Sequence, residues 1–302
     1  MNRGDAAPHA ASGADTAAFV ATDELNSWIG RTESLLDIAA AAPLAGLAAL
    51  LDRPCALGNS GVVPPLGHWL YFLPHIAQSQ LGPDGHPVKG GFLPPVPLPR
   101  RMWAGGRLQF ESAIPIGAAI ERRSTIADIS AKSGRSGAMV FVTVRHEIWV
   151  EGRCALREEQ DIVYRDAANP GSAPAPTAST ADSPAPRQSQ CTRQFHPDPI
   201  QLFRFSALTF NAHRIHYDRD YACRVEGYGG LVVHGPLTAM LLLQHFVDMQ
   251  PQAHVASFSF RALRPLLDTA AFNLCMVQEP AGASLWTENA DRQVTMTATL
   301  RS

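Results

Sequence analysis

Histidine and asparagine side chains are concentrated in one stretch of the 302-residue chain. Between Phe205 and Phe246 the sequence contains Asn211, His213, His216 and His234, flanked by apolar segments. An imidazole titrates near neutral pH, so it can take up and release a proton. An amide beside it can both donate and accept hydrogen bonds. This grouping predicts a site that transfers protons rather than a part of the core.

The same stretch contains a predicted helix start at Gly235-Pro236, which an apolar run follows. Free N–H groups at a helix N-terminus attract developing negative charge. Glycine allows a ligand to approach the backbone closely, and proline in the first turn loses only an N–H that would be unpaired anyway. Gly235 is therefore a candidate oxyanion contact, although an ordinary loop-to-helix turn fits these residues equally well.

A metal site is the less favoured interpretation of the histidines. His213 and His216 have a tolerable ligand spacing and His234 could be a third ligand, but no Cys, Asp or Glu partner follows with ligand-like spacing. We expect no metal. The cysteines are odd in number and lack a C-x-x-C pair, which indicates free thiols in a reducing compartment. They are Cys55, Cys154, Cys191, Cys223 and Cys275.

Charge and hydropathy exclude several classes of protein. The net charge is −2, so no electrostatic attraction to nucleic acid or to an anionic membrane is expected. No apolar run reaches the roughly 20 residues needed to span a bilayer. Residues 1–20 lack a secretory apolar region and contain two aspartates. We expect a disordered tail and a cytoplasmic protein.

The elements that must position the candidate site form two similar halves. Residues 42–52 are helical in propensity, residues 58–106 are an irregular Gly/Pro-rich segment that could wrap a binding groove, and residues 107–165 alternate as an antiparallel meander. Five prolines and almost no large apolar residues mark a linker after this meander.

In the second half, Asp198 is a predicted N-cap before Pro199, and the helix should carry Leu202, Phe203 and Leu208 inward. The nearly all-apolar helix after Gly235 and the strands that follow it predict a sheet curled around one buried helix. We expect this architecture twice. The predicted units are a tail at 1–20, a first domain at 21–165, a linker at 166–192 and a second domain at 193–302.

The segments FSALTFNAHRIHYDRDYA and GLVVHGPLTAMLL resemble the MaoC-type hydratase/dehydratase family, in particular its type 2 hydroxyacyl-thioester dehydratases and bacterial mesaconyl-C4-CoA/itaconyl-CoA hydratases. The first-half segments WIGRTE, GHWLYFLP and LPRRMWAGG resemble the same branch. The resemblance implies an α+β double hot-dog fold with a degenerate first unit. It also implies catalysis on acyl thioesters, with no cofactor apart from the coenzyme A of the substrate.

Carried over residue by residue, the family pattern makes His216 the catalytic histidine and Gly235 the oxyanion contact. The family's aspartate position holds Asn211 here, and the asparagine position between them holds His213. An amide cannot carry negative charge, so His216 should transfer the proton, with Asn211 orienting the water and His213 and His234 contacting the substrate.

The expected reaction is reversible hydration of mesaconyl-C4-CoA or itaconyl-CoA to citramalyl-CoA. The alternatives are a 3-hydroxyacyl-thioester dehydratase of fatty acyl chains and an inactive thioester-binding protein, which Asn211 keeps open. Arginine binds carboxylates and phosphates. The candidates for this role are Arg100, Arg101, Arg204 and Arg264. We expect a homodimer with an acyl-CoA substrate and no nucleic-acid or membrane partner.

Overall fold

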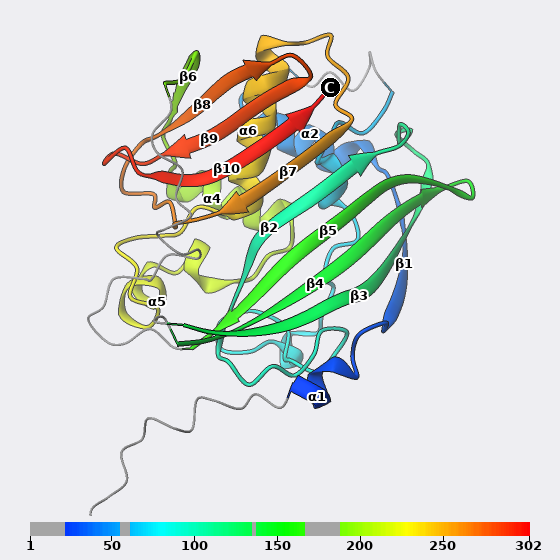
Figure 1. Ribbon diagram of the computed structural model, residues 1–302, viewed down its shortest axis with the longest axis vertical. Helices are drawn as coiled ribbons and strands as arrows, with labels where there is room; N and C mark the ends of the chain where they lie inside the picture. Colours follow the sequence, from blue (N-terminus) through cyan, green and yellow to red (C-terminus); the bar gives the residue numbers. More distant parts are fainter. Residues whose placement is uncertain (1–21, 55–60, 135–136, 167–187) are drawn as a thin grey trace, which may run out of the picture.

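A computed structural model describes residues 22–54, 61–134, 137–166 and 188–302 (Figure 1). The predicted tail and most of the predicted linker lie outside these residues. The first half contains α1 (Thr22–Asn26), β1 (Thr32–Ile38), α2 (Ala41–Leu50), η1 (Gly67–Leu70), η2 (Gln78–Gln80), β2 (Arg100–Phe110), β3 (Ala119–Gly134), β4 (Gly137–Val150) and β5 (Arg153–Arg165). The second half contains β6 (Cys191–Phe195), α4 (Pro199–Leu208), η4 (Arg214–His216), α5 (Arg219–Arg224), α6 (Gly235–Met249), β7 (Ser257–Ala262), β8 (Phe272–Glu279), β9 (Gly282–Glu288) and β10 (Val294–Arg301).

All ten strands form one antiparallel sheet in the order β1-β3-β4-β5-β2-β7-β10-β9-β8-β6. The second half of this order is the first half reversed, with each strand number raised by five. The two halves join where β2 pairs with β7, from Gly105 opposite Arg261 to Gln109 opposite Ser257. Such a repeat is the pattern of two hot-dog units joined edge to edge, and it confirms the predicted double hot-dog fold.

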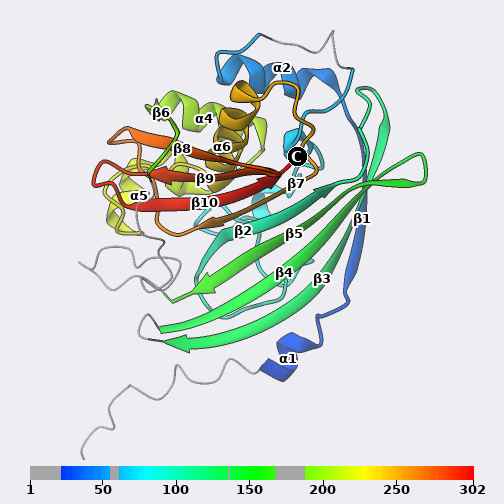
Figure 2. The same ribbon diagram turned by 45° about the horizontal axis from the view of Figure 1, so that its top comes forward.

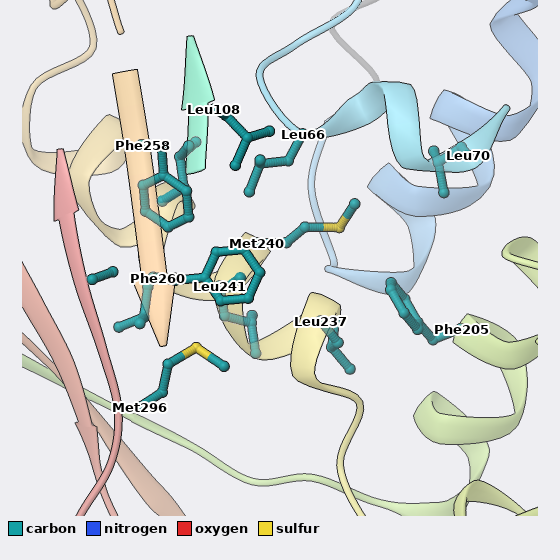
Figure 3. Packing of buried hydrophobic residues seen from close by; sticks show 14 of the residues in the cluster. Leu66, Leu70, Leu108, Phe205, Leu237, Met240, Leu241, Phe258, Phe260 and Met296 are labelled. Atoms are coloured by element: carbon teal, nitrogen blue, oxygen red, sulfur yellow. The ribbon is translucent and has the colours of Figure 1, made fainter. Parts of the chain in front are cut away.

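The second unit is wrapped around α6, as predicted. This helix begins with Pro in its first turn and buries residues on nearly every face, including Leu237, Met240 and Leu241. Figure 3 shows these side chains against Phe258 and Phe260 of β7. Burying a side chain of this size stabilises a fold by about 1.5–3 kcal/mol. The helix therefore fixes the position of its N-terminus, where Gly235 lies.

The first unit has no equivalent of α6 within the described residues. Figure 2 shows β3, β4 and β5 curving away from α6 without a long helix on their inner face. The irregular segment before β2 covers part of this face instead, because Val96 and Leu98 pack against Val140, Val142 and Val144. The missing helix leaves room for a cavity in the first unit, which is consistent with the predicted degenerate unit.

Local predictions were largely confirmed, with three exceptions. Phe203 is 62% exposed, because α4 turns Phe205 inward beside Leu202 instead. Strand β1 was not predicted: its exposure does not alternate, and it pairs at the sheet edge with β3. The predicted linker ended at residue 192, whereas β6 already begins at Cys191.

The described residues also bear on the expected free thiols and on the expected lack of a membrane-spanning segment. The four cysteines among them are free thiols. Every helix in this part of the chain is too short or too polar to span a bilayer.

Candidate active site

Helix α4 and η4 hold the loop that carries Asn211, His213 and His216. Asp198 caps α4 as predicted, accepting hydrogen bonds from the N–H groups of Ile200 (2.7 Å) and Gln201 (3.1 Å). The chain leaves α4 through a residue with positive φ, Phe210, and turns back so that Asn211 N–H donates to the Ser206 carbonyl at 2.8 Å. The turn brings the polar side chains to the α6 N-terminus.

His216 is buried, and its tautomer follows from one hydrogen bond. Nδ1 lies 2.7 Å from the carbonyl oxygen of Val232. A carbonyl only accepts, so Nδ1 carries the hydrogen and Nε2 of the neutral ring keeps its lone pair. Burial lowers the pKa of His216 to about 4, and the bond to Val232 opposes this only partly. At neutral pH His216 is therefore an uncharged proton acceptor.

His234 supports His216 from behind instead of facing the substrate cavity. Its ring stacks on the His216 ring at a centroid distance of 3.7 Å, and its Nε2 lies 2.9 Å from the Ser206 hydroxyl. The side chain is fully buried and is not among the residues that line the cavity. Burial, and then the neighbouring His216 and His213, lowers its pKa well below 6.5. The expectation that His234 contacts substrate is therefore wrong, and a positioning role fits its place.

Gly235 offers a free backbone N–H at the start of α6. The first intrahelical bond runs from Thr238 N–H to the His234 carbonyl, so the amides before it have no partner in the helix. Gly235 lines the same cavity as His216. A Cβ added there would lie 3.9 Å from the Trp103 carbonyl oxygen, an ordinary contact distance. Gly235 therefore leaves room for a ligand beside the start of α6.

Asn211 and His213 also line this cavity, but the side-chain oxygen of Asn211 is already hydrogen-bonded within its own loop. Its Oδ1 accepts a hydrogen bond from His213 N–H at 3.0 Å. The His213 ring lies edge-on to His216, with centroids 5.4 Å apart. Burial lowers the pKa of His213, and the nearby imidazoles of His86 and His216 lower it further. His213 is thus neutral at physiological pH.

The cavity has a volume of about 1010 Å³ and extends from the α6 N-terminus into the first unit. Of the four arginines proposed for it, Arg100, Arg101 and Arg264 line the wall. Arg204 is exposed on α4 and is not among the lining residues, so that prediction is wrong. Arg204 follows the exposed Phe203, and both point away from the core.

Two residues that sequence reasoning missed, Asp84 and His86, reach the site from the first unit. His86 Nδ1 lies 2.9 Å from Asp84 Oδ2, and the His86 ring lies 4.0 Å from the His213 ring. The signal in the sequence was weak, because it is an Asp-x-His in an irregular segment. Its neighbour Pro83 contacts Arg214, 131 residues later, in the loop that carries His216.

Asp84, His86 and His213 each offer one donor atom within 4.8 Å of the others, which raises the question of a metal. Two observations favour a hydrogen-bonded pair. Nδ1 of His86 is already used by the Asp84 carboxylate, and the rings of His86 and His213 lie face toward face at a tilt of 40°. In a metal site the ring-nitrogen lone pairs would converge on one point.

The deeper wall of the cavity is polar where the first unit lacks its helix. Ser124, His146 and Glu158 lie opposite one another on β3, β4 and β5. Glu158 accepts from Trp69 Nε1 at 2.9 Å and lies 3.0 Å from His68 Nε2. A sheet face that covered an apolar helix would carry no such buried row.

With this geometry in place, comparisons with known proteins identify the family. The sequence model of hydroxyacyl-thioester dehydratase type 2 matches residues 66–268. The chain is 46% identical over 275 residues to the mesaconyl-C(4)-CoA hydratase of Chloroflexus aurantiacus. The aligned region covers 91% of this chain and 96% of that protein.

Solved structures agree on the fold. A MaoC-like dehydratase from Phytophthora capsici superposes with a TM-score of 0.66 at 14% identity, over 94% of this chain and 99% of that chain. A conserved hypothetical protein of Mycobacterium tuberculosis, described as having a double hotdog fold, superposes with a TM-score of 0.54 at 16% identity, over 91% of this chain and 96% of that chain. The predicted family is thus confirmed: this chain belongs to the type 2 hydroxyacyl-thioester dehydratases, within the MaoC-type hydratases and dehydratases.

Proposed function

We propose that the chain reversibly adds water to an α,β-unsaturated acyl-CoA, with mesaconyl-C4-CoA giving citramalyl-CoA as the specific substrate pair. The observation that carries this proposal is the neutral, buried imidazole of His216 in the same cavity as the free N–H of Gly235. The 46% identity to a mesaconyl-C(4)-CoA hydratase supports the choice of substrate.

In this mechanism the thioester carbonyl oxygen accepts a hydrogen bond from Gly235 N–H at the positive end of α6. The bond strengthens as negative charge develops on that oxygen in the enolate, so it favours the transition state over the ground state. His216 Nε2, with its lone pair free, exchanges a proton with the reacting atoms. Stacking on His234 and the bond to Val232 hold the ring in one orientation.

Arg101 is the cation best suited to a free carboxylate on the acyl group. Arg100 is already paired with Glu226, its Nε 2.7 Å from the carboxylate oxygen. Arg101 forms no ion pair with a carboxylate among the described residues, although its charge acts on Asp84, His86 and His213. A guanidinium without a carboxylate partner beside the site fits a short dicarboxylic acyl group.

A fatty acyl substrate is less well supported. Such a chain needs an apolar tunnel beyond the reacting carbons, because its CH₂ groups gain free energy by leaving water for an apolar surface. The wall beyond the site instead carries His146 and Glu158, both buried, together with the part-buried Arg122. We infer a short or polar acyl group.

The test is to assay the purified protein with mesaconyl-C4-CoA, itaconyl-CoA and crotonyl-CoA, following loss of the conjugated thioester. We expect hydration of a dicarboxylic thioester with the highest kcat/KM. His216→Gln should lower kcat by about 10²–10⁴-fold, whereas His196→Gln, at an exposed histidine outside the cavity, should leave it unchanged. An inactive binding protein would hydrate none of the three, and equal activity of the two variants would refute the role of His216.

The proposal includes three further expectations. The reaction needs no cofactor beyond the coenzyme A of its substrate, the chain forms a homodimer, and it acts in the cytoplasm. Light scattering on the purified protein tests whether it is a homodimer, and activity after exhaustive dialysis tests whether the reaction needs a cofactor.

A further inference from the structure

The pair formed by Asp84 and His86 lies in a closed loop of the first unit. A bridge between Leu81 and Pro87 and a hydrogen bond from Gly82 N–H to the His86 carbonyl (2.7 Å) close the loop. Asp84 Oδ1 accepts from His86 N–H at 3.0 Å, while Oδ2 lies 2.9 Å from Nδ1 of the ring. Both carboxylate oxygens thus hold the same histidine, which fixes its ring.

This loop is docked directly on the catalytic loop of the second unit. Arg214 N–H donates to the Asp84 carbonyl at 2.9 Å, and Arg214 Nη1 donates to the Pro83 carbonyl at 3.0 Å. Gly85 has φ +88°, and a Cβ there would lie 1.8 Å from the Ala212 carbonyl oxygen. Only glycine permits this approach. The contact places the His86 ring against the His213 ring, which in turn lies edge-on to His216.

The hydrogen bond to Asp84 settles the state of His86. A carboxylate only accepts, so Nδ1 of His86 carries a hydrogen and Nε2 is the nitrogen left to exchange protons. Burial is the main cause that lowers the pKa of His86, and Arg101 adds to it, while Asp84 and Glu226 oppose it. His213 is the remaining titratable group against this ring. Of the four imidazoles that pack against one another at the α6 N-terminus (His86, His213, His216 and His234), His86 is the one whose ring is paired with a carboxylate. His68, which is paired with Glu158, lies elsewhere on the cavity wall.

The reaction calls for such a group. Adding water to a double bond moves two protons: one leaves the water oxygen and one arrives at the α-carbon. Asn211 cannot accept or carry a proton, and its Oδ1 is bonded to its own loop. His216 stacks on the residue before Gly235, so it lies on the side of the thioester carbonyl and the α-carbon. The His213 ring lies 4.0 Å from the His86 ring and 5.4 Å from the His216 ring, so it stands between them, and we assign His86 to the neighbouring β-carbon.

We propose that His86 is a second catalytic residue of the hydration and that Asp84 positions it and stabilises its charged form, an inference that rests on the proposed function. In dehydration, His216 Nε2 takes the α-proton and the electron pair moves onto the thioester oxygen at Gly235. The pair then forms the double bond, the bond from the β-carbon to oxygen breaks, and His86 Nε2–H gives its proton to the leaving hydroxide, which becomes water. Hydration is the reverse. Before the next dehydration His216 releases the proton it took up and His86 takes up one, directly or through water, so the pair of imidazoles carries one proton throughout and Asp84 balances its charge.

The first test removes the proton-transfer nitrogen. His86→Gln should lower kcat by about 10²–10⁴-fold with a smaller change in KM. The control His196→Gln should have wild-type kinetics, and thermal unfolding with coenzyme A binding should show that both variants are folded. A His86→Gln protein with kcat within about threefold of wild type would overturn the proposal.

The second test separates catalysis from structure. Asp84→Asn keeps the shape and an oxygen that accepts from His86 N–H, but it removes the negative charge beside the ring. The proton on His86 is then held less tightly, so the alkaline limb of the kcat profile should move to lower pH by about 1–3 units. A loss of activity with the limb unmoved would mean a structural role and would overturn the proposal, even if His86→Gln does not fold.

Two further outcomes are informative. If a chelator abolished wild-type activity and zinc restored it, the pair would be a ligand set and the proposal would be wrong. The assays use whichever thioester the wild type hydrates best. A wild type inert toward every thioester refutes the proposed function and this inference with it, whereas an active wild type with an equally active His86→Gln refutes this inference alone.

Discussion

Acid should unfold this protein because it keeps neutral histidines in its interior. Burial lowers the pKa of His216 and of His146 from the usual value of 6.5 to about 4. In the unfolded chain both regain the usual value, so between pH 6.5 and about 4 the unfolded state binds more protons than the folded state. Stability is then complete above pH 6.5 and is lost as the pH falls toward 4.

The size of this effect follows from the same two values. This lowering corresponds to about 3 kcal/mol for each histidine when the pH is well below both values. At pH 5 the expected loss is about 2 kcal/mol for each, or about 4 kcal/mol together. Domains are stable by about 5–15 kcal/mol. The protonation of these two side chains therefore removes a large part of the free energy of unfolding at pH 5.

Urea denaturation at pH 7.5, 6.0 and 5.0 measures this loss. The double variant His146→Gln/His216→Gln starts less stable at pH 7.5 but should lose about 4 kcal/mol less than wild type on going to pH 5. His196→Gln, at an exposed site, should follow the wild-type curve. If the double variant and wild type lost stability in parallel, the two histidines would not be neutral groups of the folded protein, and the assignment of His216 as an uncharged base would fail with them.

Three other substitutions test the geometry of the site. Gly235→Ala keeps the backbone N–H, and the added Cβ meets no atom closer than 3.9 Å, whereas Gly235→Pro removes the N–H at a position where helices accept proline. The proline variant should have a kcat about 10²–10³-fold lower than that of the alanine variant. Equal kcat values would exclude the oxyanion contact. Arg101→Gln should raise KM about 10–100-fold for a dicarboxylic thioester and leave KM for crotonyl-CoA nearly unchanged, whereas the lost charge beside His86 should alter kcat for both substrates alike. Arg107→Gln, outside the cavity on the same strand, is the control; a parallel change in KM for both substrates would contradict carboxylate binding. Gly85→Ala should strain the loop around Asp84 and His86 by at least about 1–2 kcal/mol, increase amide hydrogen exchange over residues 81–93 and lower kcat. Unchanged hydrogen exchange would show that this loop does not depend on the close contact of Gly85 with the Ala212 carbonyl.

Local signals in the sequence were sufficient for most elements of the fold. These signals act over a few residues, so they predict an element without any knowledge of what it packs against. They are the alternating residues in β3, β4 and β5, the Asp198 cap of α4 and the apolar run of α6. The pattern from Asn211 to Gly235 likewise predicted the loop and helix start that the structure places at one cavity. The resemblance of the segments around this pattern to the MaoC-type family predicted both the family and the double hot-dog fold correctly.

Only the tertiary structure decided which other side chains join these. Pairing of β2 with β7 joins the two units, and it brings Asp84 and His86 against a loop more than a hundred residues away. The same arrangement puts His234 behind His216 and turns Arg204 to solvent. Hydrophobic periodicity and helix capping depend on neighbours along the chain, whereas these contacts depend on how the two units of one sheet are joined, and no local pattern in the sequence encodes that arrangement.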